Sequence, residues 1–113
     1  MNARASCYDV ATFEQFWPHY VRLHTRSVTQ WMHALASVSC IALLAAGVAC
    51  RSPLLLLAAP LADYAIAQAS HRFFERNRTT PWKKQSWHTR AELRMLRYVL
   101  TGRMRSEVAR CCG

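Results

Sequence analysis

Acidic residues and glycine are scarce in this chain. Of its 113 residues, six are Asp or Glu and three are Gly, whereas 15 are Lys or Arg, which gives a net charge of +9. The low Gly and Pro content and the 52% hydrophobic residues exclude a disordered or collagen-like chain. This length predicts a single domain over residues 1–113. The positive charge indicates a phosphate-bearing partner, either a nucleic acid or the anionic face of a membrane.

Charged side chains are missing from two long stretches in the middle of the sequence. Residues 27–50 contain none, and residues 52–70 contain only Asp63. A helix of about 20 apolar residues crosses a hydrocarbon core of about 30 Å. We therefore predict an all-α fold built on a membrane helical hairpin, with spans at about 31–50 and 53–70. Arg51-Ser52-Pro53 would form the turn between them.

The distribution of basic residues predicts how this hairpin is oriented. Arg51 lies at the turn, and the other fourteen basic residues lie on the side that holds both termini. The positive-inside rule then places both termini in the cytoplasm, as in a multi-pass protein of a bacterial inner membrane. Membrane lipid is the expected partner. Nucleic-acid binding would require the same charge in a soluble protein, and is not expected. A soluble bundle that buries the hairpin is the competing interpretation.

Amphipathic helices at the membrane interface are expected on both sides of the hairpin. The segment 12–24 begins with Thr12 and Gln15 at capping-box spacing, followed by aromatic residues at helical intervals. The segment 88–101 separates an apolar stripe from a cationic one, and Gly102 is placed to end it. Residues 77–81 would end the second helix before this last helix begins. We expect the cationic stripe to face the cytoplasmic lipid surface or solvent.

The cysteines form no pattern typical of zinc or disulfide chemistry. Their number is odd and there is no C-x-x-C motif, so we expect all five to be reduced: Cys7, Cys40, Cys50, Cys111 and Cys112. The adjacent pair near the end of the chain could accept a lipid, although a flexible tail is the simpler interpretation.

Histidines are the best candidates for chemistry. His33 and His71 each lie roughly 27 Å from the turn at 1.5 Å per residue, and therefore at the same depth. His24 precedes the first span and returns to that level, while Glu75 follows His71 by one helical turn. Imidazoles with a carboxylate are a ligand set for Fe(II), Zn or Mn. Histidines at a membrane boundary with no metal are the alternative.

Several segments together resemble a known family of small membrane proteins. They are Phe16-Trp17-Pro18-His19-Tyr20 with His24, then His33, His71-Arg72-Phe73-Phe74-Glu75-Arg76-Asn77, Trp87, Arg94-Met95 and Leu100-Thr101-Gly102-Arg103. In order and spacing, over about residues 12–105, they resemble the family typified by the fungal 2-hydroxy fatty acid dioxygenase.

This resemblance implies an enzyme that uses Fe(II) and dioxygen to shorten a 2-hydroxy fatty acid by one carbon. It implies His24, His33 and His71 as metal ligands, Glu75 and Asn77 as catalytic residues, and an acyl chain as substrate. Whether Glu75 would orient His71 or bind the metal directly is left open.

The sequence also departs from the family pattern. Arg26 stands where the family usually shows a second His, and Glu92 stands where it usually shows Asp. The alternative function is therefore a non-catalytic membrane protein with a decayed metal site, whose cationic helix binds lipid or a partner. His88 could replace the missing ligand, or could be a surface residue. Asp63, a carboxyl group inside a span, could support a metal ligand, contact Ser37 or Ser39, or be neutral.

Overall fold

A computed structural model of the protein describes residues 10–77 and 85–112. These residues contain helices and no strand, so the predicted all-α class is confirmed. The helices are α1 (Phe13–Arg22), α2 (Ser27–Ala49), α3 (Pro53–Ser70), the π-helix η1 (His71–Glu75), α4 (Gln85–Leu100) and α5 (Met104–Cys112). Cys7 and most of the expected breaker at 77–81 lie outside the described residues.

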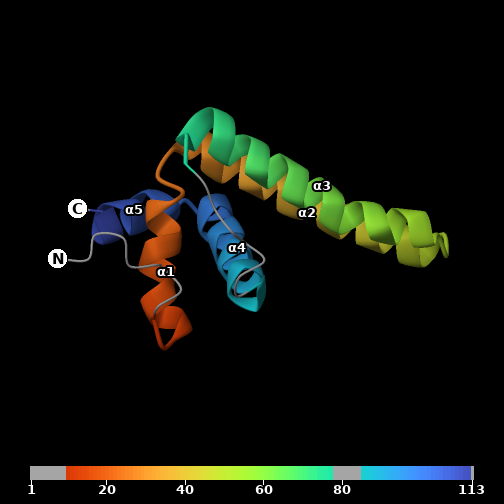
Figure 1. Ribbon diagram of the computed structural model, residues 1–113, viewed down its shortest axis with the longest axis horizontal. Coiled ribbons are helices and arrows are strands. Elements are labelled where there is room, and N and C mark those ends of the chain that lie inside the picture. Colours follow the sequence, from red (N-terminus) through yellow and green to blue (C-terminus); the bar gives the residue numbers. More distant parts are fainter. Residues whose placement is uncertain (1–9, 78–84, 113) are drawn as a thin grey trace.

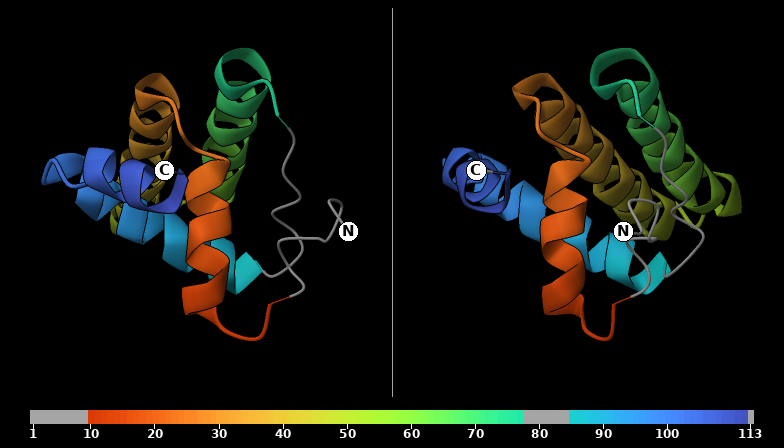
Figure 2. Two further views of the ribbon diagram at one scale, coloured as in Figure 1. Left: turned by 90° about the vertical axis from the view of Figure 1, so that its left-hand side faces the viewer. Right: turned by 60° about the vertical axis from the view of Figure 1, so that its left-hand side comes forward.

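The molecule consists of a long hairpin and a helical head. Helices α2 and α3 run antiparallel, side by side, and project away from α1, α4 and α5 (Figure 1). Helix α4 packs against α2 near the base of the hairpin, and α1 and α5 pack on α4 and on each other (Figures 1 and 2). The molecule is elongated as a result, with extents of 52 × 28 × 26 Å. The head has the aromatic core of the protein, whereas the hairpin is held by small residues.

The turn of the hairpin forms for local reasons. Arg51 adopts a left-handed conformation with φ 53°, and the Ser52 N–H donates to Gly47 O at 2.9 Å. Ser52 Oγ accepts from Leu55 N–H and caps α3, whose first residue is Pro53. A Cβ atom at Gly47 would lie 2.7 Å from Leu56 Cδ2, so glycine lets the two helices approach closely here.

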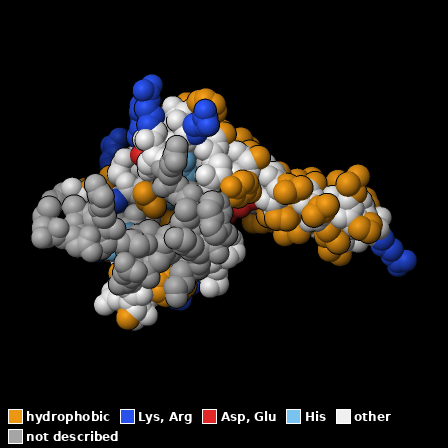
Figure 3. All heavy atoms as spheres, in the orientation of Figure 1, with side chains coloured by type: hydrophobic (Ala, Val, Ile, Leu, Met, Phe, Trp, Pro, Cys, Tyr) orange, Lys and Arg blue, Asp and Glu red, His pale blue; other side chains and the backbone are white. Residues whose placement is uncertain are grey.

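Both helices of the hairpin are long and apolar enough to cross a membrane. The candidate spans are Ser27–Ala49 and Pro53–Glu75, and only 28% and 17% of their most apolar windows are buried. The predicted spans at 31–50 and 53–70 fall on α2 and α3. Hydrophobic side chains cover the visible face of the hairpin in Figure 3. Large residues such as Leu54 and Val48 are 74% and 70% exposed, so the hairpin presents apolar surface to its surroundings.

Helix α1 anchors the head. Thr12 Oγ1 accepts from Gln15 N–H at 3.2 Å, as the predicted cap requires, and the helix ends at Arg22 rather than at His24. Its aromatic side chains form the core together with the buried face of α4: Phe13, Phe16, Trp17, Tyr20, Ala91, Met95 and Val99. The early end of α1 frees the backbone at His24 to turn toward the hairpin.

Helix α4 differs from its predicted orientation. Arg94 pairs with Glu14 at 2.8 Å and lies over the rings of Phe13 and Trp17, and Arg90 also lies over Phe13. Of the three arginines of the cationic stripe, Arg90, Arg94 and Arg97, the first two therefore contact α1, while Arg90 and Arg97 are exposed as expected. Leu93 and Leu100 are exposed instead, at 50% and 62%. Gly102, with φ 75°, follows the end of the helix as expected.

The end of the chain is not the flexible tail favoured from the sequence, because residues 104–112 form α5. Trp17 Nε1–H donates to Glu107 Oε1 at 2.8 Å, and Arg22 Nε–H donates to the carbonyl of Cys111 at 3.3 Å. These bonds dock α5 on α1. The residues joined by each bond are about 90 positions apart in the sequence. Helical periodicity therefore could not predict these contacts.

Candidate metal centre

Three buried imidazoles meet at the base of the hairpin. His24 follows α1, His33 lies on α2, and His71 begins η1. The Nε2 atom of His33 lies 3.1 Å from that of His24 and 3.2 Å from that of His71. One ligand atom from each residue falls within 4.8 Å of the others, and the three residues are 1%, 5% and 2% exposed. This group could hold a metal ion.

Each of these rings has an acceptor at its other nitrogen. The Nδ1 atoms of His24 and His71 lie 2.6 Å from Tyr20 O and 2.7 Å from Asn77 Oδ1. His33 Nδ1 lies 3.4 Å from Glu92 Oε1. The carbonyl oxygens assign a proton to Nδ1 of His24 and of His71, and an ionised Glu92 would do the same for His33, which directs the Nε2 lone pairs at a common centre. Such convergence is unfavourable without a cation and is the arrangement that histidine metal ligands adopt.

The π-helix brings His71 and Asn77 together. Its wider turn ends at Arg76, which is left-handed with φ 58°, and the Asn77 N–H donates to His71 O at 3.1 Å. The Asn77 amide then donates through Nδ2 to Leu23 O at 3.1 Å, next to His24. One side chain thereby orients His71 and ties η1 to the end of α1. Single π-helical turns inside longer helices are frequent at functional sites.

Glu75 occupies a different place from the three histidines. Its carboxylate accepts from the Arg26 N–H at 2.5 Å and from Thr25 Oγ1–H at 3.1 Å, and so caps the beginning of α2. Arg26 itself donates from Nη1 to Phe74 O at 3.0 Å. Neither open role considered from the sequence, orienting His71 or joining the metal ligands, corresponds to this contact. The structure thus brings together His24, His33, His71 and Asn77, with Glu75 and Arg26 at the adjoining turn.

Burial keeps the imidazoles of His24 and His88 neutral. Burial lowers the pKa of His24 well below its ordinary value, and the neighbouring His33 and His71 lower it further. The pKa of His88 falls to about 4, chiefly through burial and also through His71 and His33. Neutral imidazole is the form that binds a metal, so His24 is ready to do so at pH 7.

The three histidines form one end of a cavity of about 410 Å³ between α3 and α4. Its wall on α3 follows one helical face from His71 through Ala67 to Tyr64 and Pro60, and its wall on α4 includes His88 and Glu92. The end at the histidines is therefore rich in imidazole. Away from them, Pro60, Leu61 and Tyr64 line the cavity together with Asp63, and Leu61 and Tyr64 are 59% and 47% exposed.

Helix α4 contributes site residues that the sequence analysis missed or left open. Glu92 contacts His33, and Gln85, Thr89 and the buried His88 line the same cavity. Their spacing of three and four residues places them on one helical face, a signal present in the sequence. Asp63 lines the cavity from α3, and its buried Oδ1 atom has no hydrogen-bond partner among the described residues. Burial raises the pKa of Glu92.

Comparison with known proteins gives one match. A family model described as 2-hydroxy-palmitic acid dioxygenase Mpo1-like matches residues 10–104. The chain belongs to the Mpo1-like family. Neither a curated protein nor a solved structure matches it. The Mpo1-like region includes the three histidines, Asn77 and the cavity, and it ends at the first residue of α5.

We expect removal of the Glu92 carboxylate to weaken metal binding. In Glu92→Ala, His33 loses the acceptor at Nδ1, so its tautomer and ring orientation are no longer fixed, and affinity should fall roughly 10–100-fold. Chelator competition with Co(II) or Fe(II) measures this. Thr89→Ala, a change on the same face of α4 away from His33, is the matched control. Equal affinities for Glu92→Ala and the wild type would contradict the role.

We also expect the stability of the protein to fall between pH 6.5 and 4, partly because of His88. The unfolded chain protonates this residue near its ordinary pKa of 6.5, whereas the folded protein does so at about 4. Stability is thus complete above pH 6.5 and declines as the pH falls. His88→Gln should reduce the slope in this window by about one proton and leave the slope above pH 7 unchanged. Thermal unfolding at a series of pH values tests this, and parallel curves would refute it.

Proposed function

We propose that this Mpo1-like protein is an Fe(II)-dependent dioxygenase, embedded in a membrane, that shortens 2-hydroxy fatty acids by one carbon. The observation that carries the proposal is the meeting of three imidazole Nε2 atoms in a cavity that continues along α3 past Tyr64, Leu61 and Pro60. A metal ion and an acyl chain would therefore occupy the same cavity.

The imidazole nitrogens of the three histidines are suitable ligands for iron. His24, His33 and His71 would hold Fe(II) through nitrogen, which is a suitable ligand for this ion and leaves coordination positions open. When bound, the iron would supply the activation of dioxygen and the attachment point for the 2-hydroxyl and carboxylate of the substrate. Tyr20 O, Glu92 and Asn77 would keep the three rings in the tautomer and orientation that binding requires.

The remaining residues of the cavity would bind and orient the substrate. Ala67 leaves room on α3 next to His71, and the side chains of Tyr64, Leu61 and Pro60 would hold the alkyl chain. The buried faces of α1 and α4 would exclude water from the polar end. Leu61 and Tyr64 are exposed on the hairpin, so the acyl chain would enter laterally past them from the bilayer.

Membrane placement is part of the proposal. The exposed apolar surface of the hairpin supports insertion, since water solvates such a surface poorly. Positive charge favours the cytoplasmic side of a membrane. The head carries much of the positive charge of the described residues, on Arg22, Arg90, Arg94, Arg97, Arg103, Arg105 and Arg110. Both termini would then be cytoplasmic, in a bacterial inner membrane.

The non-catalytic alternative rested on Arg26 in place of a family histidine. The guanidinium of Arg26 bonds to Phe74 O, and His24, His33 and His71 could hold a metal ion without a ligand from this position. This supports the catalytic function over the non-catalytic one.

Iron content and turnover test the function directly. Protein purified without oxygen should contain about one Fe(II) per chain and convert 2-hydroxypalmitate to the acid with one carbon fewer, with consumption of dioxygen. His33→Ala and His71→Ala should lose the iron and the activity, whereas His19→Gln, outside the cluster, should keep both. A folded wild-type protein that takes up no iron, or that binds iron without turnover, would refute the proposal.

Obstruction of the cavity should separate metal binding from substrate binding. In Ala67→Phe, the ring would fill the space below His71, so we expect iron to be retained and turnover of 2-hydroxypalmitate to fall at least tenfold. Ala65→Phe places the same ring on the exposed side of α3 and is the matched control. Iron analysis and activity assays on the same samples make the comparison. Undiminished turnover in Ala67→Phe would place the substrate elsewhere.

A further inference from the structure

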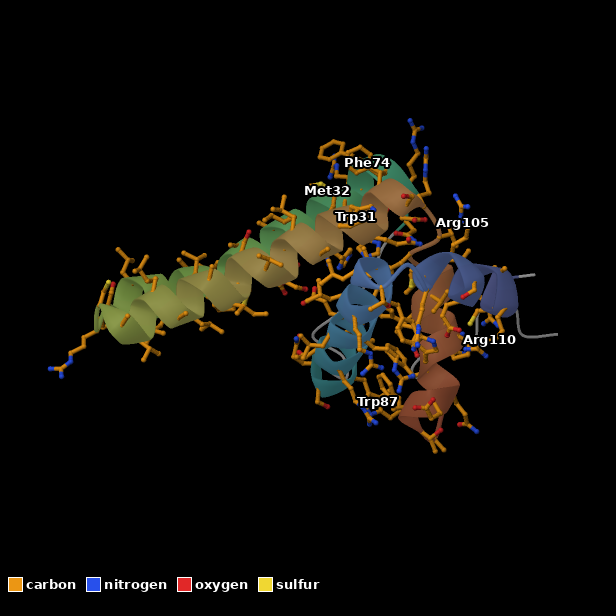
Figure 4. All side chains as sticks on the ribbon, turned by 180° about the vertical axis from the view of Figure 1, so that it is seen from behind. Trp31, Met32, Phe74, Trp87, Arg105 and Arg110 are labelled. Atoms are coloured by element: carbon orange, nitrogen blue, oxygen red, sulfur yellow. The ribbon has the colours of Figure 1, made fainter. Side chains whose placement is uncertain are left out.

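Arginine and aromatic side chains surround the base of the hairpin. Trp31 on α2 is 55% exposed and Phe73 on η1 is 66% exposed, and the Arg72 guanidinium lies 5.9 Å from the Phe73 ring. Arg26, which precedes α2, and Arg76, which follows η1, are also exposed. We call these five residues the basal collar. Figure 3 shows Lys and Arg side chains at the base of the hairpin and at its tip, with apolar side chains between, and Figure 4 places Trp31 and Phe74 at the end nearest the head.

The collar is fixed in place by the backbone around it. Arg26 is held through its N–H by Glu75 and through its guanidinium by Phe74 O. Arg76 holds the left-handed position that ends η1. Among the described residues, no ion pair of 4.0 Å or less involves the three collar arginines, and the nearby Glu75 carboxylate accepts from the Arg26 N–H and from Thr25. The exposed guanidinium groups of Arg72 and Arg76 are therefore available to an external anion.

The length of the hairpin matches the thickness of a bilayer. The 23 residues of α2 extend about 34 Å at 1.5 Å per residue, so Arg51 at the tip and the collar at the base are separated by slightly more than a hydrocarbon core of about 30 Å. Within the hairpin between these levels, the one charged residue is Asp63, which lines the cavity, and Glu92 of α4 contacts His33 beside it. Trp and Arg are the residues that anchor helices at the level of the lipid headgroups.

We propose that the basal collar binds the phosphates of anionic phospholipids and thereby sets the depth of the protein in the membrane. This inference rests on the membrane placement proposed above. A second copy of the chain is a poorer occupant, because a two-fold interface would place the three arginines against the same three arginines. Headgroup phosphate satisfies the charge while the hydrocarbon below it covers the adjacent apolar surface.

The collar would also orient the cavity in the bilayer. Arg72 and Arg76 belong to the same turn as His71 and Asn77, so fixing this turn at the headgroups fixes the polar end of the cavity there. The apolar end, near Pro60 and Leu61, then lies deeper in the hydrocarbon. A single-chain amphiphile could enter with its polar group at the histidines and its tail parallel to the lipid chains.

Lipid retention tests the collar. The full-length protein is reconstituted in phosphatidylcholine and phosphatidylglycerol, repurified, and its bound lipids are quantified. We expect several-fold enrichment of phosphatidylglycerol in the wild type, loss of the enrichment in Arg72→Gln/Arg76→Gln, and its retention in Arg103→Gln/Arg105→Gln, which removes the same charge from the exposed turn before α5 and its first residues. Bulk lipid composition in the wild type, or equal loss in both variants, would overturn the proposal.

The depth of Trp31 provides an independent measurement. The fluorescence that disappears in Trp31→Phe should be quenched most by lipids brominated close to the headgroup, and strongest quenching by bromine near the bilayer centre would contradict the proposed depth. Carbonate extraction tests membrane insertion separately from the preference for phosphatidylglycerol. A wild-type protein released by carbonate would refute both the membrane placement and the collar, whereas a retained protein without phosphatidylglycerol preference would refute the collar alone. Neither lipid measurement depends on iron.

Discussion

The structure depends on three buried imidazoles that must remain neutral with their Nε2 atoms directed at one point. Burial makes a charged imidazole costly, and the proximity of the other rings increases that cost for His24. Hydrogen bonding at Nδ1 decides which nitrogen faces the centre. The acceptors come from the last turn of α1, from α4 and from the residue after Arg76, so all of these elements must be in place before the three lone pairs can converge.

This constraint explains why a small protein uses so many separate elements at one site. The hairpin alone supplies His33 and His71 at one level, because antiparallel helices of equal rise return to the same height. Close contact between the two helices requires small residues, of which Gly47, Ala36 and Ala59 are examples. The head supplies His24 and Glu92, and its aromatic core seals the polar end. The hairpin thus determines where the site lies, and the head determines which form the histidines take.

The parts of this arrangement that follow from fixed helical geometry were predictable from the sequence. Charge-free runs predicted the hairpin, Ser52 and Pro53 marked its turn, and a rise of 1.5 Å per residue predicted that His33 and His71 would lie level. The contact of Glu75 was not predictable in this way. An α-helical spacing places it one turn after His71, but the chain is π-helical from His71 onward, and Glu75 caps α2 instead. The positions of α4 and α5 depend on contacts between distant residues, such as Trp17 with Glu107. Single-chain periodicity does not encode such contacts.

The groups that face the Nδ1 atoms of the three histidines differ in charge, and this difference affects the basicity of the opposite nitrogen. His24 and His71 donate to a backbone carbonyl and an amide, which are neutral, whereas His33 faces the carboxyl group of Glu92. A carboxylate makes the opposite nitrogen of an imidazole more basic than a neutral acceptor does. If the three imidazoles hold a metal ion, His33 would therefore be the strongest donor of the three. Glu92 also lines the cavity, so one carboxyl group on α4 would set both the donor strength of this ligand and the polarity of the cavity wall.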